Sequence, residues 1–330
     1  MRILITGIAG MIGFHSARHF AKLGWEVLGV DNFNPYYNPD LKEDRAEILR
    51  KEHSIPIMRA DIQDFDKTDT NTNFLHGVDV VLHLAAYANP RHALEEPQPY
   101  IDTNITGTQR IIEVCEKRDI PVVYASSSCV MHGQPLPWNE HDRPDLQNNP
   151  YGWSKRANEC QFAHSKIKRS AGLRFFTVYG PYGRPDMALF KFTDAIVKGE
   201  PMTLYNFGDM KRDFTYVQDI VNGIELVVDK TVNDTDTWHE IYNIGYGEQV
   251  NLIDFVDEIE KNLDRKGERI LAPKHPADVP ETWSDTTKLQ ALGYKPTTSI
   301  KEGVKEFMFV LGQARVEGTV QMIINPVAIY

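Results

Sequence analysis

Short apolar runs recur along the first half of the chain, and longer stretches of mixed apolar and polar residues separate them. The runs are nearly continuous in apolar residues, which predicts strands buried on both faces; they lie at residues 2–7, 25–31, 78–86, 120–128 and 172–180. The mixed stretches predict helices at 10–24, at 104–119 and from 151 to about 169. Strands that alternate with helices indicate a parallel sheet covered on both faces.

The pattern changes after residue 180. Turn-forming residues cluster at 180–186 and 206–213, and beyond them we expect one more strand at 239–245 and a helix at 251–265. The chain therefore predicts two units. A large sheet domain is expected to comprise 1–175 and about 213–245, and a smaller α/β domain to comprise 176–212 and 246–330.

Charge and composition exclude several classes of protein. The chain has 330 residues and a formal net charge of -10, with no basic block, which argues against nucleic-acid and anionic-membrane partners. The chain has no run of about 18 apolar residues, so we expect no membrane span. Three cysteines, Cys115, Cys129 and Cys160, indicate a reducing compartment such as the cytoplasm. The helical pair His15 and His19 lacks the glutamate of a zinc-hydrolase helix, so we expect no metal site.

Three glycines follow the first predicted strand, at Gly7, Gly10 and Gly13, where a helix is expected to begin. Such glycines permit a tight turn, a close approach of backbone to a pyrophosphate, and close helix–strand packing. Asp31 ends the second predicted strand, at the distance expected for an acid that binds ribose hydroxyls. An acid there disfavours a 2'-phosphate, so the pattern predicts NAD rather than NADP.

Tyr151 and Lys155 lie four residues apart in a predicted helix, and therefore on one face. A cation beside a tyrosine favours its ionised form, so this pair is suited to acid/base catalysis, although the same spacing also occurs on solvated helices. The predicted strand at 120–128 ends in three serines at 126–128, and ligands of parallel sheets bind at the carboxyl ends of strands.

Together these motifs resemble the extended short-chain dehydrogenase/reductase family, which includes nucleotide-sugar epimerases and dehydratases. The resemblance rests on TGxxGxxG at 6–13, HLAA at 83–86, the serine cluster and YxxxK. It implies an α/β fold with a Rossmann-type doubly wound parallel sheet, Tyr151 as the base, Lys155 as the group that lowers its pKa and holds the nicotinamide ribose, and an assisting serine. The register leaves both Ser127 and Ser128 open for that serine.

The resemblance also implies a set of residues that contact NAD. They are Gly7, Gly10, Met11, Ile12, Gly13, Asp31, Asn32, Asp61, Ile62, Leu84, Ala85, Ala86, Asn104, Tyr151 and Lys155.

Four further segments, at 31–45, 173–190, 212–220 and 278–286, resemble the UDP-glucuronate 4-epimerases of that family. This implies a UDP-sugar substrate, with Thr177, Arg184 and Met187 at the sugar, Arg212 at the diphosphate and Asp278 at the uridine ribose. Arg91, Ser127 and Ser128 complete the expected substrate contacts.

Alternatives remain at this point. A UDP-glucose or UDP-N-acetylglucosamine 4-epimerase is the second choice, and a non-catalytic NAD-binding regulator is disfavoured because Tyr151 and Lys155 are both present. Cys129 stands where decarboxylating and dehydrating relatives carry acids, which argues against those reactions. The family resemblance implies a homodimer through the helices that follow Asn104 and Tyr151. Residues 309–330 match no part of the family pattern.

Overall fold

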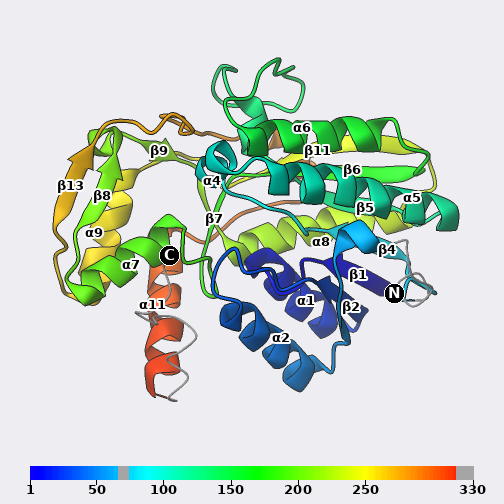
Figure 1. The fold of residues 1–330 in the computed structure, drawn as a ribbon, viewed down its shortest axis with the longest axis horizontal. Helices are drawn as coiled ribbons and strands as arrows, with labels where there is room; N and C mark the ends of the chain where they lie inside the picture. Colours follow the sequence, from blue (N-terminus) through cyan, green and yellow to red (C-terminus); the bar gives the residue numbers. More distant parts are fainter. Residues whose placement is uncertain (66–73, 317–330) are drawn as a thin grey trace.

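A seven-stranded sheet forms the centre of the molecule (Figure 1). The computed structural model describes residues 1–65 and 74–316. Every strand pair in this sheet is parallel, in the order β11-β6-β5-β4-β1-β2-β3. The strands are β1 (Arg2–Thr6), β2 (Glu26–Asp31), β3 (Ile57–Arg59), β4 (Val80–His83), β5 (Val122–Ser127), β6 (Arg169–Phe175) and β11 (Trp238–Ile244). This is the doubly wound, Rossmann-type sheet that the apolar runs predict.

Helices cover both faces of the sheet because successive strand residues point to opposite sides. Ile3 and Ile5 of β1 pack into a core shared with α1 (Met11–Lys22), α2 (Asp40–His53) and α8 (Val217–Asn233). Leu4 between them packs into a second core with α5 (Thr108–Arg118) and α6 (Pro150–Ala163). Each face of the sheet therefore has its own apolar core.

A third apolar core lies in the lobe at the left of Figure 1. It is built by α7 (Ala188–Lys198), β8 (Met202–Tyr205), β10 (Phe214–Tyr216), α9 (Leu252–Leu263) and α11 (Ile300–Val316). Two-stranded pairings join β7 (Thr177–Tyr179) to β10, β9 (Lys211–Arg212) to β12 (Val250–Asn251), and β8 to β13 (Arg269–Ala272). We propose that the chain divides into two domains at the boundaries predicted from the sequence.

The remaining elements are short. They are α4 (Pro90–Glu95), α10 (Thr287–Gln290), the 3-10 helices η1 (Ile62–Asp64), η3 (Ser128–Met131) and η4 (Asn206–Gly208), and the π-helix η2 (Tyr100–Gly107). Within the described residues, no helix is long and apolar enough to cross a membrane. In the same part of the chain, no group of three or more histidine, cysteine or acidic side chains is arranged to hold a metal ion.

Three predicted elements need correction. The strand expected at 172–180 is divided into β6 and β7 at Phe176. The N–H of Phe176 still donates to Ile244 of β11, whereas the N–H of Thr177 donates to the carbonyl of Asp213, directly before β10. The helix expected to reach about 169 ends at Ala163. The helix expected at 104–119 begins earlier, as the π-helix that starts at Tyr100. Residues 309–330, which match no part of the family pattern, lie in α11 up to Val316, and the rest lie outside the described residues.

Candidate active site

The loop between β1 and α1 is shaped by contacts that only glycine permits. Gly7 has φ +71, and a Cβ there would lie 2.8 Å from the backbone nitrogen of Ala85. A Cβ on Gly13 would lie 2.3 Å from the carbonyl oxygen of Gly7. Gly10 is the N-cap of α1, and no side chain caps the helix. The first-turn amides of Met11, Ile12 and Gly13 therefore form the kind of helix N-terminus that binds phosphate.

Acidic side chains line the next strand ends. The Asp31 carboxylate accepts hydrogen bonds from the N–H groups of Ala9 (3.0 Å) and Phe33 (2.8 Å), which fixes it beside the phosphate loop. Asn32 donates from its side chain to Asp61 (2.8 Å), and Ile62 follows Asp61 at the start of η1. These four predicted cofactor contacts therefore form one border of the glycine loop, with carboxylate oxygens available for ribose hydroxyls.

The segment after β4 closes the other side of this loop. The N–H of Leu84 donates to the Thr6 carbonyl (3.1 Å), and that of Ala85 donates to the Thr6 hydroxyl (3.2 Å), which places Ala86 next along the edge. Asn104 is fully buried and is hydrogen-bonded within the protein, because its side chain both accepts from and donates to the backbone of Tyr87. Asn104 thus holds this segment in place.

Tyr151 and Lys155 share one face of α6, and both are buried. The helix begins at Pro150 after Asn149, whose side chain accepts from the N–H of Gly152 (2.8 Å). Burial lowers the pKa of Lys155 to about 7. Its Nζ lies 3.4 Å from the Asn158 side-chain oxygen, and no carboxylate in the described part of the chain pairs with it. A buried ammonium with one long hydrogen bond fits the ribose hydroxyls of a dinucleotide.

The three serines at the end of β5 have different environments. The hydroxyl of Ser126 donates to Glu159 (2.7 Å). That of Ser127 accepts from the N–H of Cys129 (3.1 Å) and is close enough to Tyr151 to lower the pKa of that phenol. Ser128 begins η3 and is buried. This arrangement favours Ser127 over Ser128 as the partner of the tyrosine, and the assignment of the assisting serine stays a prediction.

The protein groups around Tyr151 raise its pKa, which corrects the direction expected from the sequence. Burial is the largest cause and the neighbouring Cys129 thiol adds to the rise, while the hydrogen bond with Ser127 and the charge of Arg184 act in the opposite direction. Lys155 itself is buried and only partly protonated near neutral pH, so it is a weak source of positive charge. These protein groups alone therefore do not make the phenol acidic.

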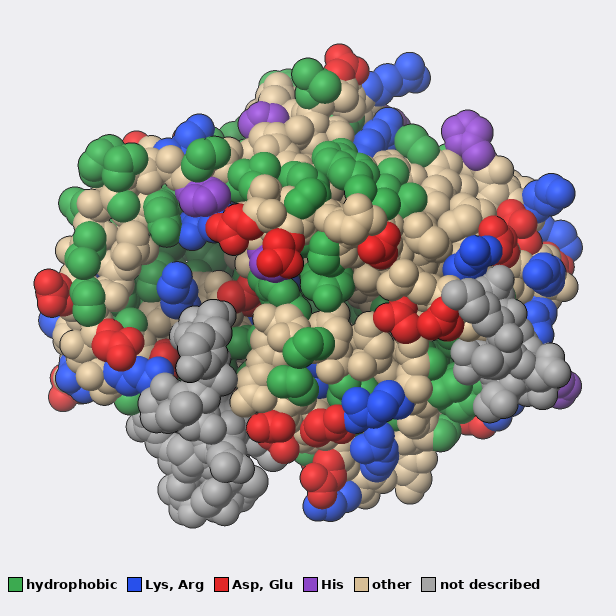
Figure 2. Space-filling view, viewed as in Figure 1, with side chains coloured by type: hydrophobic (Ala, Val, Ile, Leu, Met, Phe, Trp, Pro, Cys, Tyr) green, Lys and Arg blue, Asp and Glu red, His purple; other side chains and the backbone are tan. Residues whose placement is uncertain are grey.

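Three predicted substrate residues, Arg91, Arg212 and Asp278, come together. Arg91 forms a two-point ion pair with Asp278 (3.2 and 2.8 Å) and stacks on the ring of Tyr205. Arg212 donates to the carbonyls of Val279 (2.7 Å) and Pro280 (2.9 Å), directly after Asp278. These contacts draw α4, β9 and the 278–280 segment around one point, where two guanidinium groups offer donors to an anion. Figure 2 shows the surface hollowed between the left lobe and the sheet domain.

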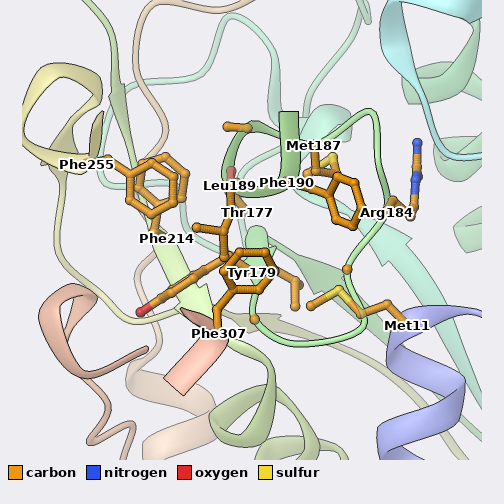
Figure 3. A pocket seen from close by; sticks show the side chains of 14 residues that line it. Met11, Thr177, Tyr179, Arg184, Met187, Leu189, Phe190, Phe214, Phe255 and Phe307 are labelled. Atoms are coloured by element: carbon orange, nitrogen blue, oxygen red, sulfur yellow. The ribbon is translucent and has the colours of Figure 1, made fainter. Parts of the chain in front are cut away.

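Thr177 and Met187 line a small pocket between the sheet domain and the third core (Figure 3). Arg184 also lines it, but Figure 3 shows its guanidinium turned away from Thr177. The guanidinium forms a two-point ion pair with Asp186 (3.0 and 2.5 Å) and donates to the carbonyl of Ala88 (2.8 Å). Of its five N–H groups, two remain for other partners.

The sequence did not single out the residues around Asp186. Its carboxylate also accepts from the Tyr36 hydroxyl (3.1 Å) and from the side chain of Asn89 (2.9 Å), so segments after β2, β4 and β7 meet there. Burial alone would raise the pKa of Asp186, but Arg184 and these donors outweigh it and lower the pKa. No local motif reveals such a cluster, because its members are up to 150 residues apart.

Comparison with known proteins identifies relatives along almost the whole chain. The model of the NAD dependent epimerase/dehydratase family matches residues 3–245. A probable UDP-glucuronate 4-epimerase of Rhizobium meliloti is 37% identical over 93% of this chain and 96% of its own. UDP-glucuronate 4-epimerase 1 of Arabidopsis thaliana is 37% identical over 93% of this chain and 75% of its own.

A solved structure has the same fold. The crystal structure of UDP-glucuronic acid 4-epimerase from Bacillus cereus, in complex with UDP-glucuronic acid and NAD, has a TM-score of 0.87. It is 30% identical to this chain and the match covers 95% of this chain and 99% of that one.

Proposed function

The chain belongs to the NAD dependent epimerase/dehydratase family, and from this premise we propose that it is a UDP-glucuronate 4-epimerase. The reaction interconverts UDP-glucuronate and UDP-galacturonate by oxidation and re-reduction at C4. The observation that carries the proposal is the position of Cys129. It packs against Tyr151, and its N–H donates to the Ser127 hydroxyl. The charges of Arg212 and Asp278 both act on its thiol, which links the proposed base to an arginine cluster suited to a diphosphate.

The residues of the sheet domain fit NAD. The amides of the first turn of α1 would hold the pyrophosphate, Asp31 would hold the adenosine ribose, and Lys155 would hold the nicotinamide ribose. When bound, NAD would supply a reversible hydride acceptor, through which C4 of the sugar could be oxidised and then reduced from the opposite face. The cofactor is unchanged over the full reaction, so a catalytic amount suffices.

Tyr151 moves the proton in both half-reactions. Its phenolate oxygen takes the proton of the sugar 4-hydroxyl during oxidation and gives it back during reduction. The Ser127 hydroxyl, within reach of that oxygen, orients the sugar hydroxyl and shares the proton path. Burial excludes water from Tyr151, which strengthens the interaction of its negative charge with cations in the site.

The substrate contacts divide into two groups. Arg212, Arg91 and Asp278 bind the UDP portion, with the arginines at the diphosphate and the carboxylate at the ribose hydroxyls. Thr177 and Arg184 supply donors to the sugar carboxylate, and Met187 lines the same cavity. Two observations support both groups of contacts. One is the positions of these side chains, and the other is the similarity of the chain to UDP-glucuronate 4-epimerases.

A proton NMR time course tests the reaction. Purified protein is given UDP-glucuronate and catalytic NAD, and we expect signals of UDP-galacturonate that disappear in Tyr151→Phe. Tyr242→Phe is the matched control, because its hydroxyl donates to Glu240 outside the site. It removes the same atom and is expected to leave turnover intact.

Other outcomes would replace the proposal. A UDP-pentose signal would mean that decarboxylation dominates. Turnover of UDP-glucose or UDP-N-acetylglucosamine without turnover of UDP-glucuronate would assign the enzyme to neutral sugars. In that case Arg184 serves only its pair with Asp186.

We further propose a homodimer in the cytoplasm. The three cysteines are free, which supports a reducing compartment. The helices expected at the dimer contact are α5 and α6, on the same face of the sheet. Mass measurement in solution tests this assembly, and a monomer at micromolar concentration would contradict it.

A further inference from the structure

A buried ion pair lies behind the proposed active site. The carboxylate of Glu159 in α6 and the guanidinium of Arg174 in β6 form a two-point pair at 2.8 and 3.0 Å, and each side chain is 2% exposed. Two further donors reach the same carboxylate: the Ser126 hydroxyl (2.7 Å) and Arg156 (2.8 Å). Burying two charges is costly, and an apolar pair of the same volume is often at least as stable. Stability alone therefore does not account for this arrangement.

The position of the pair links it to the reacting groups. Tyr151, Lys155 and Glu159 are spaced four residues apart, so they follow one another along one face of α6. On the sheet, Ser126 is the register partner of Arg174 and directly precedes Ser127. Glu159 thus contacts both strands and holds the helix that carries the base against the strand that carries the serine.

We propose that Glu159 and Arg174 are positioning residues that keep the Tyr151 hydroxyl within hydrogen-bonding reach of Ser127. This inference rests on the proposed function of Tyr151 as base. The short bond from Ser126 to Glu159 fixes the end of β5 relative to α6, and Arg174 fixes the Glu159 side chain through two parallel bonds. Small errors in such distances are expensive, because a displacement of about 1 Å can reduce a rate by about 100-fold.

Three single variants separate alignment from overall stability. Ser126→Ala removes the link to the strand and leaves the ion pair, and Glu159→Gln removes the charge of the pair. Arg156→Gln is the control, since it removes a half-exposed partner of Glu159 without loosening the contact between α6 and the strands. We expect kcat for UDP-glucuronate to fall about tenfold in the first two variants, with KM nearly unchanged, and to stay close to wild type in the third.

A double-mutant cycle gives the decisive readout. If Glu159 acts through the contact between Tyr151 and Ser127, its effect depends on Ser127 being present. Glu159→Gln is then expected to cost about tenfold in the wild-type background and less than about twofold in Ser127→Ala. Equal losses in both backgrounds, or unchanged kcat in Ser126→Ala, would overturn the proposal and leave the pair a purely structural role.

The design keeps the two proposals apart. Wild-type turnover of UDP-glucuronate is measured first, and its absence counts against the proposed function alone. If UDP-glucose is turned over instead, the same variants are assayed with that sugar, because alignment of the base does not involve the carboxylate. Should Glu159→Gln fail to fold, Ser126→Ala retains the ion pair and still decides the outcome.

Discussion

Replacing Lys155 by methionine is expected to stabilise the cofactor-free protein while abolishing its activity. The two side chains are unbranched and similar in length, so the change mainly removes a charge. Lys155 is 2% exposed and has no carboxylate partner in the described residues. Burial lowers its pKa in the folded protein from 10.5 to about 7, so folding works against the protonated form.

The magnitude follows from the shift in pKa. Because the folded pKa is lower than the unfolded one, the unfolded state binds more protons between pH 7 and 10.5, and stability rises with pH in that range. Below pH 7 lysine is charged in both states and the full cost is present. One pKa unit is worth about 1.4 kcal/mol, so the cost falls from roughly 4–5 kcal/mol at pH 6 to about 2 kcal/mol at pH 9.

Urea denaturation of wild type and Lys155→Met at pH 6 and pH 9 checks this. Both proteins are freed of NAD, because bound cofactor adds its own binding energy to the wild type. We expect the variant to be more stable at both values, with the difference about 2–3 kcal/mol smaller at pH 9. A variant that is equally or less stable at pH 6, or a difference independent of pH, would refute the reasoning.

Three further predictions concern other parts of the structure. Gly13→Ala places a Cβ 2.3 Å from a backbone oxygen. It is expected to lower the free energy of unfolding by about 1–3 kcal/mol and to weaken NAD binding measured by calorimetry. Gly312→Ala, whose Cβ would enter open space, is the control and is expected to be neutral or slightly stabilising. Asp213 is fully buried and accepts from five donors, so Asp213→Ala is expected to lower the free energy of unfolding by several kcal/mol in urea titrations, and an unchanged midpoint would contradict this. Arg91→Ala leaves Asp278 unpaired and is expected to weaken UDP binding at least tenfold, while an unchanged Kd would remove Arg91 from the site.

The fold was accessible from the sequence because buried parallel strands are nearly continuous in apolar residues. Six of the seven strands of the sheet coincide with predicted strands, and only the three-residue β3 was missed. The same reasoning failed at Phe176, since an apolar run does not show where a strand changes its partner. Helix α8 escaped the sequence analysis although its buried residues recur every three to four positions, at Val217, Ile220, Val221 and Ile224.

Site residues could be predicted from the sequence where they belong to short motifs. They could not be predicted where segments distant in the sequence meet. The glycine loop and the pair in α6 are local patterns with a chemical reason for their spacing. Arg184 pairs with the nearby Asp186, but Tyr36 and Asn89, which also bind Asp186, come from other strand ends. Glu159 shares the spacing of Tyr151 and Lys155, yet only the fold shows that Arg174 lies opposite it.

The ion pair between Arg91 and Asp278 joins residues 187 positions apart, and this separation orders the events of synthesis. At about 5–20 residues per second, a ribosome adds Asp278 roughly 10–40 s after Arg91. The strands of the central sheet, the glycine loop and α6 have all been synthesised by then. A nascent chain can therefore complete its dinucleotide half before it can hold a sugar nucleotide, and a truncated chain would keep the first ability without the second.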